Sequence, residues 1–227
     1  NREHADFTAK TGKPASGMSD AEAAQVIAKA KADGLDTIFE DLRKQVRAMD
    51  DAVLDTLEDG QLVSAAQVAA LRKKYPEHVP LNRILPDDTD DSFVGAVFGV
   101  PRFSTRVSGV KTGEGSDLAI DDVYASVLTN LKDAIIRAER NKVSLTAVEF
   151  FERHATPTVK VTRPKPIGTT SDGAPIFPQP DTNATLVARE SVDPAKPARQ
   201  VWVEFDDPLL ARAFTGMNIE QTNTLLR

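Results

Sequence analysis

Five basic residues in two irregular stretches have the chemistry to contact nucleic acid: Arg102, Arg106, Lys111, Arg163 and Lys165. Guanidinium and ammonium groups neutralise backbone phosphates, and Phe103 could offer a ring on which a base stacks. The net charge of −6 argues against a broad footprint on a duplex, so any such surface would be local. Ordinary surface charge is the simpler explanation of the same residues. A nucleic-acid interface is kept as one alternative.

A second set could form an enzyme site if the chain brings it together: Tyr75, His78, Arg83, Asp91 and Arg102. Imidazole, carboxylate and guanidinium groups are the ordinary means of proton transfer and charge stabilisation. The competing interpretation is structural. Val79-Pro80-Leu81 would be an extended segment pinned in a groove, with Arg83 paired to a carboxylate, and we favour this role.

Other signals for catalysis, metals or cofactors are weak. The chain has no cysteine, and its three histidines lie far apart in sequence. The acidic run Asp87–Asp91 lacks the glycine and the closing glutamate of an EF-hand loop. The glycine-rich stretch Gly109–Ser116 lacks the Lys-Ser/Thr pair of a phosphate loop. We therefore predict no catalytic residues, no metal and no cofactor in this chain.

Helices dominate the elements that would position these residues. Residues 1–18 are predicted as an extended arm, and Ser19 with Glu22 and Ser64 with Gln67 have the spacing of capping boxes. Gly34 and Gly60 are predicted helix ends. Between them, apolar residues at steps of three or four predict a long amphipathic helix: Leu35, Ile38, Phe39, Leu42, Val46, Met49, Val53 and Leu57.

The longest predicted helix starts at Ser116 or Asp117 and continues to about His154, with a possible break at Asn141–Ser144. Its predicted buried side consists of Ile120, Val123, Tyr124, Val127, Leu128, Leu131, Ile135, Ala138, Val148 and Phe151. Together, residues 19–156 form a helical region with an irregular insert at 76–116. No apolar run approaches the ~20 residues of a membrane span.

Alternation of apolar and polar residues then predicts strands at Thr158–Thr162, Thr185–Glu190 and Gln200–Phe205. They would form a small antiparallel sheet within residues 157–206, with an exposed proline-rich loop at 163–181. Asp206 or Asp207 would cap a helix with Pro208 in its first turn, and residues 207–227 would hold the C-terminal helices. The predicted fold class is α+β, predominantly helical, with one long central helix and a small antiparallel sheet near the C-terminus.

Four segments, taken in order, resemble a known family: Gly17–Ala23, Leu71–Arg83, Asp133–Val143, and Val203–Ala213 followed by Gly216-Met217-Asn218. They are similar to the PLxRFG-type module of large polyvalent proteins from tailed bacteriophages, prophages and conjugative elements. The resemblance spans nearly the whole chain and departs at Ile84-Leu85, where the family name implies Phe-Gly. It marks a set of motif residues: Tyr75, Val79, Pro80, Leu81, Arg83, Arg137, Glu139, Asn141, Asp207 and Pro208.

The resemblance implies a context for this chain. Such proteins are very long and are packaged in the virion or sent with mobile DNA into the recipient cell, and catalytic domains usually lie elsewhere in them. We therefore expect a non-catalytic structural or interaction segment of a phage internal or ejected protein. Its partners would be other segments of the parent chain, other virion proteins, copies of itself or DNA. It would reside in the virion interior and enter the host bacterial cell, or otherwise in the bacterial cytoplasm.

Overall fold

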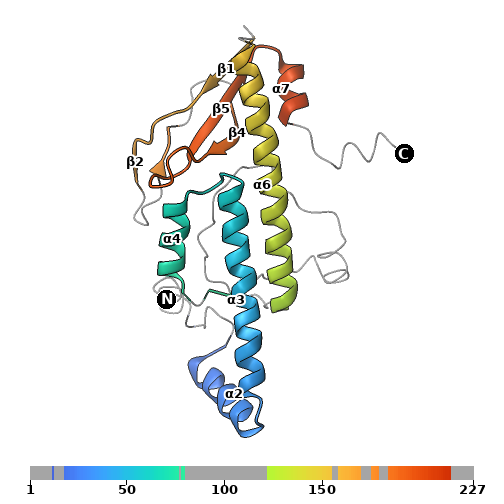
Figure 1. Ribbon diagram of the computed structural model, residues 1–227, viewed down its shortest axis with the longest axis vertical. Coiled ribbons are helices and arrows are strands. Elements are labelled where there is room, and N and C mark those ends of the chain that lie inside the picture. The colour runs from blue at the N-terminus through green and yellow to red at the C-terminus, as the bar shows by residue number, and fades with distance from the viewer. Residues whose placement is uncertain are drawn as a thin grey trace, which may run out of the picture. The chain divides into compact units, whose positions relative to one another are not determined.

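The computed structural model describes residues 12, 18–76, 78–79, 122–154, 158–169, 175–178 and 184–215. Within these residues the predicted fold class is confirmed: five helices, one of them long, accompany a three-stranded antiparallel sheet in the C-terminal region (Figure 1). The chain divides into two compact units. Of the described residues, 12, 18–53, 78–79 and 122–132 belong to the first unit, and the others belong to the second.

Helix α2, Asp20–Ala32, has the predicted bounds. The Oγ atom of Ser19 accepts from the main-chain N–H of Glu22 at 3.3 Å, and the Glu22 carboxylate accepts from the N–H of Ser19 at 2.8 Å. At the other end, Gly34 has a φ of +70°, and the N–H of Leu35 reaches back to the carbonyl of Ala30 at 2.9 Å. This glycine is needed because a left-handed residue closes the helix.

Helix α3, Asp36–Asp59, follows and ends in the same way, with one difference. The left-handed residue is Gln61, with a φ of +59°, and the N–H of Leu62 bonds the carbonyl of Leu57 at 2.9 Å. Gly60 therefore does not supply the left-handed residue, and glycine is needed there for a steric reason. A Cβ atom at this position would lie 2.5 Å from the Cβ of Ala138.

The apolar stripe of α3 is only partly buried. Val46 and Leu57 are in the interior, with 7% and 3% of their surfaces exposed. Ile38 and Phe39 are 56% and 51% exposed. The predicted periodicity is correct. The described residues bury only part of the stripe, however, and the apolar side chains at its N-terminal end are exposed.

Helix α4, Ala65–Lys74, begins with the second predicted capping box, between Ser64 and Gln67. Val63 and Val68 are each 2% exposed, as expected for a hydrophobic staple across a helix start. Tyr75 ends the helix, and its N–H donates to the carbonyl of Leu71 at 2.8 Å.

Helix α6, Val123–Arg153, is the long helix, and it differs from the prediction at its start and its middle. The predicted caps Ser116 and Asp117 lie outside the described residues. Asp122 serves instead, because its Oδ1 accepts from the N–H of Ala125 at 3.0 Å. The predicted break at Asn141–Ser144 is wrong, since the helix runs through these residues without interruption.

The predicted buried side of α6 is correct only in part. Val127, Ala138 and Val148 are at most 2% exposed, whereas Leu128 and Ile135 are 49% and 47% exposed. This helix has apolar residues on more than one side, so periodicity alone could not tell which side the rest of the chain covers.

The three-stranded sheet has the order β1-β5-β4 and is antiparallel throughout, as predicted. Strand β1 is Val159–Thr162, β4 is Thr185–Glu190 and β5 is Arg199–Phe205. A shift in register between Leu186 and Ala188 interrupts the pairing of β4 with β5. The loop predicted at 163–181 contains a further short pair, β2 (Gly168–Thr169) and β3 (Pro175–Ile176).

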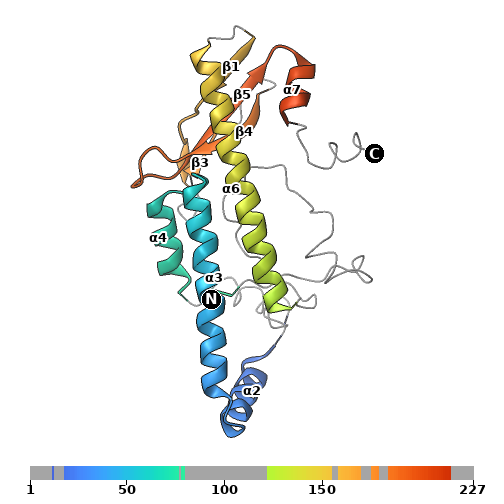
Figure 2. The same cartoon turned by 45° about the vertical axis from the view of Figure 1, so that its right-hand side comes forward.

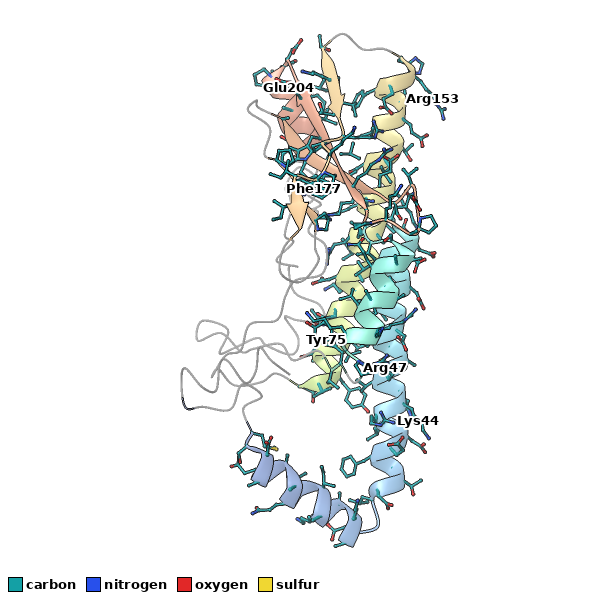
Figure 3. The ribbon with its side chains drawn as sticks, turned by 90° about the vertical axis from the view of Figure 1, so that its left-hand side faces the viewer. Lys44, Arg47, Tyr75, Arg153, Phe177 and Glu204 are labelled. Carbon is teal, nitrogen blue, oxygen red and sulfur yellow. The ribbon has the colours of Figure 1, made fainter. Side chains whose placement is uncertain are left out.

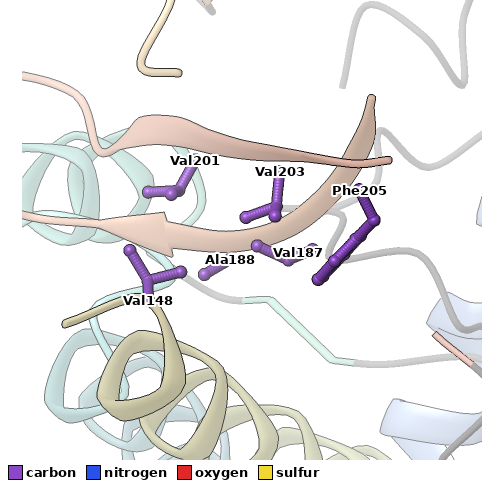
Figure 4. Packing of buried hydrophobic residues seen from close by; sticks show 6 residues of the cluster. All are labelled: Val148, Val187, Ala188, Val201, Val203 and Phe205. Atoms are coloured by element: carbon purple, nitrogen blue, oxygen red, sulfur yellow. The ribbon is translucent and has the colours of Figure 1, made fainter. Parts of the chain in front are cut away.

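One face of this sheet packs on the C-terminal half of α6, and the two lie side by side in Figures 1 and 2. Val201, Val203 and Phe205 alternate inward along β5, as predicted, and meet Val187 and Val148 of α6 (Figure 4). Burying each of these side chains contributes about 1.5–3 kcal/mol. Helix α7, Pro208–Thr215, then begins at Asp207, whose Oδ1 accepts from the N–H of Leu209 at 2.8 Å.

Candidate functional site

A buried polar arrangement in the second unit centres on Asn141, which is 1% exposed. Its Nδ2 donates to the carbonyls of Gly60 and Arg189, both at 2.7 Å, and its Oδ1 accepts from the N–H of Arg189 at 2.7 Å. The side-chain amide has two donors and an acceptor, and all three functions are used. We call Asn141, Gly60, Ala138 and Arg189 the Asn141 junction.

Strand β4 is at an edge of the sheet, where its free N–H and C=O groups need partners. Asn141 supplies them at Arg189, in the position that another strand would otherwise occupy. The hydrogen bond between Asn141 and Gly60 brings the end of α3 close to α6. Ala138 lies one turn before Asn141, and a side chain at residue 60 would collide with it. The junction therefore ties the end of α3 and strand β4 to α6.

A second polar tie links α4 to the connection between β4 and β5. The Oε1 atom of Gln67 accepts from the N–H groups of Ser64 and Ala198, each at 3.0 Å. The N–H of Ala66 donates to the carbonyl of Pro194 at 2.9 Å. The capping box seen in the sequence thus also holds a segment more than a hundred residues away.

Arg163, a predicted nucleic-acid contact, lies in a network of four charges. Its guanidinium group binds the Glu152 carboxylate and donates to Glu190 at 2.9 Å, and Glu190 also pairs with Arg199 at 2.8 Å. Hydrogen bonds from Arg163 lower the pKa of Glu152, and the two carboxylates raise the pKa of Arg163. Two carboxylates therefore already offset the charge of Arg163, which weakens its case as a phosphate contact.

The structure says little about the other four residues predicted to contact nucleic acid. Lys165 is exposed, while Arg102, Arg106 and Lys111 lie outside the described residues. Only Arg163 and Lys165 of the five are among the described residues, so a nucleic-acid interface there stays a prediction.

His78, from the predicted enzyme alternative, has an acidic partner. Its Nδ1 lies 3.0 Å from the Oδ1 of Asp50 on α3, and the Asp50 side chain is only 13% exposed. A histidine oriented by a carboxylate is part of many proton-transfer sites, but the same contact is also an ordinary structural hydrogen bond. Arg83, Asp91 and Arg102 lie outside the described residues, so this alternative also stays a prediction.

The motif residues marked by the resemblance occupy scaffold positions where they are described. Tyr75 ends α4, Asp207 and Pro208 begin α7, and Glu139 pairs with Lys142 at 2.9 Å on the exposed side of α6. Val79 is 40% exposed, and Pro80, Leu81 and Arg83 lie outside the described residues. Asn141 has the clearest role among them.

Arg137, the remaining motif residue, is partly buried on α6, as is Arg189 on β4. Burial lowers the pKa of Arg137, against the attraction of Asp133. Burial also lowers the pKa of Arg189, and the positive charge of Arg137 lowers it further. Sequence reasoning marked Arg137 but missed Arg189, because nothing local in Thr185–Glu190 signals a contact with α6.

Among the described residues, no group of three or more histidine, aspartate or glutamate side chains could hold a metal ion. None of the helices described is long and apolar enough to cross a membrane. Comparisons of the chain with protein-family models, with curated proteins and with solved structures find no match.

Proposed function

We propose that this chain is a non-catalytic structural and interaction segment of a very large phage internal or ejected virion protein, or of a related polyvalent protein. The four ordered segments that resemble such proteins support this assignment. So does the scaffold role of the motif residues that are described, with Asn141 as the clearest case.

The observation that carries the interaction role is the exposure of large apolar side chains on α2 and α3. Val26 and Ile27 on α2 are 54% and 56% exposed, and Ile38 and Phe39 on α3 are 56% and 51% exposed. Apolar side chains left exposed next to one another, as in the pairs Val26-Ile27 and Ile38-Phe39, favour contact with other molecules.

The same property recurs on α6 within the second unit. Ile135, Val143 and Phe150 are 47%, 59% and 56% exposed. With 3.6 residues per turn, they lie within about 80° of one another, on one broad side of the helix. A helix that is apolar on the side away from the sheet is suited to packing against a further helix or another chain.

The partners we propose are other segments of the parent chain, other virion proteins, or further copies of this chain, with DNA as a further candidate. The proposed location is the virion interior, from which the protein passes into the host bacterial cell. In that setting the exposed apolar side chains of α2, α3 and α6 would be covered by neighbours in the particle.

Mass spectrometry of purified virions tests this proposal. Peptides of this chain, found in the particle as part of a much longer polypeptide, would support a packaged protein. Cross-linking within the particle would then identify what covers Phe39 and Phe150. Absence from the particle would refute the proposed virion location. A mature polypeptide of only this length would refute the proposal that the chain is a segment of a much longer protein.

A further inference from the structure

Helix α2 leaves an apolar face exposed. Four of its residues follow the spacing i, i+3, i+4 and i+7 of one helix face: Ala23, Val26, Ile27 and Ala30. None of the 13 residues of α2, all of which the structure describes, is buried, and Val26 and Ile27 are 54% and 56% exposed. Figure 3 shows α2 diverging from α3 beyond the turn that joins them. An isolated helix of this length is marginal in water, since most helices depend on the packing of an apolar face, so this face needs a partner.

Charged residues border this apolar face and are divided between the two ends of α2. Asp20 and Glu22 lie in the first turn, and Lys29 and Lys31 lie in the last turn. At about 100° per residue, Asp20 and Lys31 lie about 20° apart around the helix on one border of the face. Glu22 and Lys29 lie about 20° apart on the other border. The helix dipole favours acids at the start and lysines at the end, but it does not require one of each on both borders.

An antiparallel second copy of α2 matches both borders in one register. Rotation about a two-fold axis perpendicular to the helices reverses their direction and leaves each border on its own side. Asp20 precedes the midpoint between residues 25 and 26 by as many residues as Lys31 follows it, and the same holds for Glu22 and Lys29. With the axis at this midpoint, Asp20 faces Lys31 of the second copy on one border and Glu22 faces Lys29 on the other. Because a two-fold interface is self-complementary, each contact is formed twice.

Other arrangements of a helix on this face satisfy the charges less well. A parallel second copy would place Asp20 beside its own counterpart and Lys31 beside its own, and like charges that face each other across an interface are unfavourable. A partner helix of a single sign of charge would match one end of α2 and oppose the other. The distribution of charge therefore favours an antiparallel copy of α2 as the occupant of its apolar face.

We propose that α2 binds the α2 of a second copy of this chain in antiparallel orientation, with the apolar face at the centre and the charge pairs at its borders. The proposal rests on the interaction role assigned above to the exposed side chains of α2 and α3, and it names one occupant. Glu22 also accepts from Ser19 through its Oε2, but a carboxylate has about four lone-pair sites, so capping and pairing are compatible. Because α2 is about 20 Å long, the interface is small, and the dimer is weaker than a permanent one.

Analytical ultracentrifugation of the full chain over a range of concentrations measures this association. We expect a reversible dimer that weakens as salt is added, because exposed charge pairs are screened. Lys29→Glu combined with Lys31→Glu makes every border contact one between like charges and should raise the dissociation constant about ten-fold or more. Lys160→Glu combined with Lys196→Glu is the matched control. It changes the net charge equally at side chains that are 74% and 78% exposed outside α2, and it should dimerise as the unchanged protein does.

Single cysteines test the orientation and leave the charges of α2 unchanged, so they also serve if the glutamate variant loses this helix. The chain has no cysteine of its own. In the proposed register the two copies of residue 26 are offset by only about 1.5 Å along the helix axis, whereas the two copies of residue 30 are about 14 Å apart. Because a disulfide needs Cα atoms within about 7 Å, Val26→Cys should cross-link under mild oxidation and Ala30→Cys should not.

Three results would overturn the proposal: a chain that is monomeric at every concentration, equal association by all the charge variants, or efficient cross-linking by Ala30→Cys, which indicates a parallel pair. Each of these concerns the second copy as the occupant of α2. The parent protein is tested separately by peptides of the chain in virions, so the failure of one proposal is distinguishable from the failure of the other.

Discussion

The side-chain amide of Asn141 is bonded to both main-chain groups of Arg189, with the Asn141 Nδ2 and Oδ1 each 2.7 Å from their partners. Residues 141 and 189 are thus joined across 48 positions of the chain by a side chain that imitates a neighbouring strand. Because β4 is an edge strand, this contact also protects it from pairing with another chain. Its energetic importance can be measured directly.

Asn141→Leu is expected to lower the free energy of unfolding by about 2–4 kcal/mol. The substitution keeps the branched shape and the number of side-chain heavy atoms. It leaves the N–H of Arg189 and the carbonyl of Gly60 without the hydrogen-bond partner that Asn141 provides. Urea denaturation followed by circular dichroism measures this loss.

Lys142→Ala is the control for Asn141→Leu, since its side chain lies on the surface and pairs with exposed Glu139. We expect a change below about 0.5 kcal/mol. Similar losses for both variants would mean that Asn141 stabilises the helix in general and not the junction.

Gly60→Ala tests the close approach of α3 to α6. The added Cβ would lie 2.5 Å from the Cβ and 2.6 Å from the Cα of Ala138, so one element must move. Overpacking of this kind costs about 1–3 kcal/mol. The thermal melting temperature should fall accordingly.

A double-mutant cycle with Ala138→Gly separates this clash from other effects of the Gly60 substitution. Ala138→Gly alone should cost about 1 kcal/mol in helix propensity. The double variant should lose less unfolding free energy than the sum of the two single variants, because the Cβ of residue 138 is gone. Part of the loss should remain, because the Cα of residue 138 still lies close to the added Cβ. Strict additivity would show that the contact between residues 60 and 138 is not what makes Gly60 necessary.

These relationships mark the limit of prediction from the sequence. Capping boxes, the α2 end and the alternation of β5 are local patterns, and the structure has them as expected. The sequence predicts a possible helix break at Asn141, because the partners of Asn141, Gly60 and Arg189, are 81 and 48 residues away and invisible in the local pattern. No local pattern encodes such a pairing. Likewise, periodicity identifies the apolar sides of α6 but not which one is covered.

Glu152→Gln is expected to change how stability depends on pH. The native-state pKa of Glu152 is lowered by Arg163, in a network that also holds Glu190 and Arg199. The stabilisation is present above the unfolded-state pKa, near 4.3, and is lost as the pH falls through the lower native value. Because Glu152 is exposed, the loss at pH 7 should not exceed about 1 kcal/mol.

Urea titrations at several pH values measure this dependence. The difference between the unchanged protein and Glu152→Gln should shrink as the pH drops below about 4. Glu149→Gln is the control, since its partner Arg153 is 76% exposed and the pair should contribute little at any pH. A difference that persists unchanged in acid would assign the effect to packing and not to charge.

Replacing both Ile38 and Phe39 by serine tests the surface on which the proposed interaction role rests. Because these side chains are 56% and 51% exposed, the free energy of unfolding of the isolated chain should change by less than about 0.5 kcal/mol for each. Val46→Ala, in the same stripe but 7% exposed, should cost about 1–3 kcal/mol and serves as the buried comparison. Binding to virion proteins, or self-association measured by analytical ultracentrifugation, should fall in the serine variant. A large loss of stability there would place Ile38 and Phe39 in the core of the chain and remove the main support for the interaction surface.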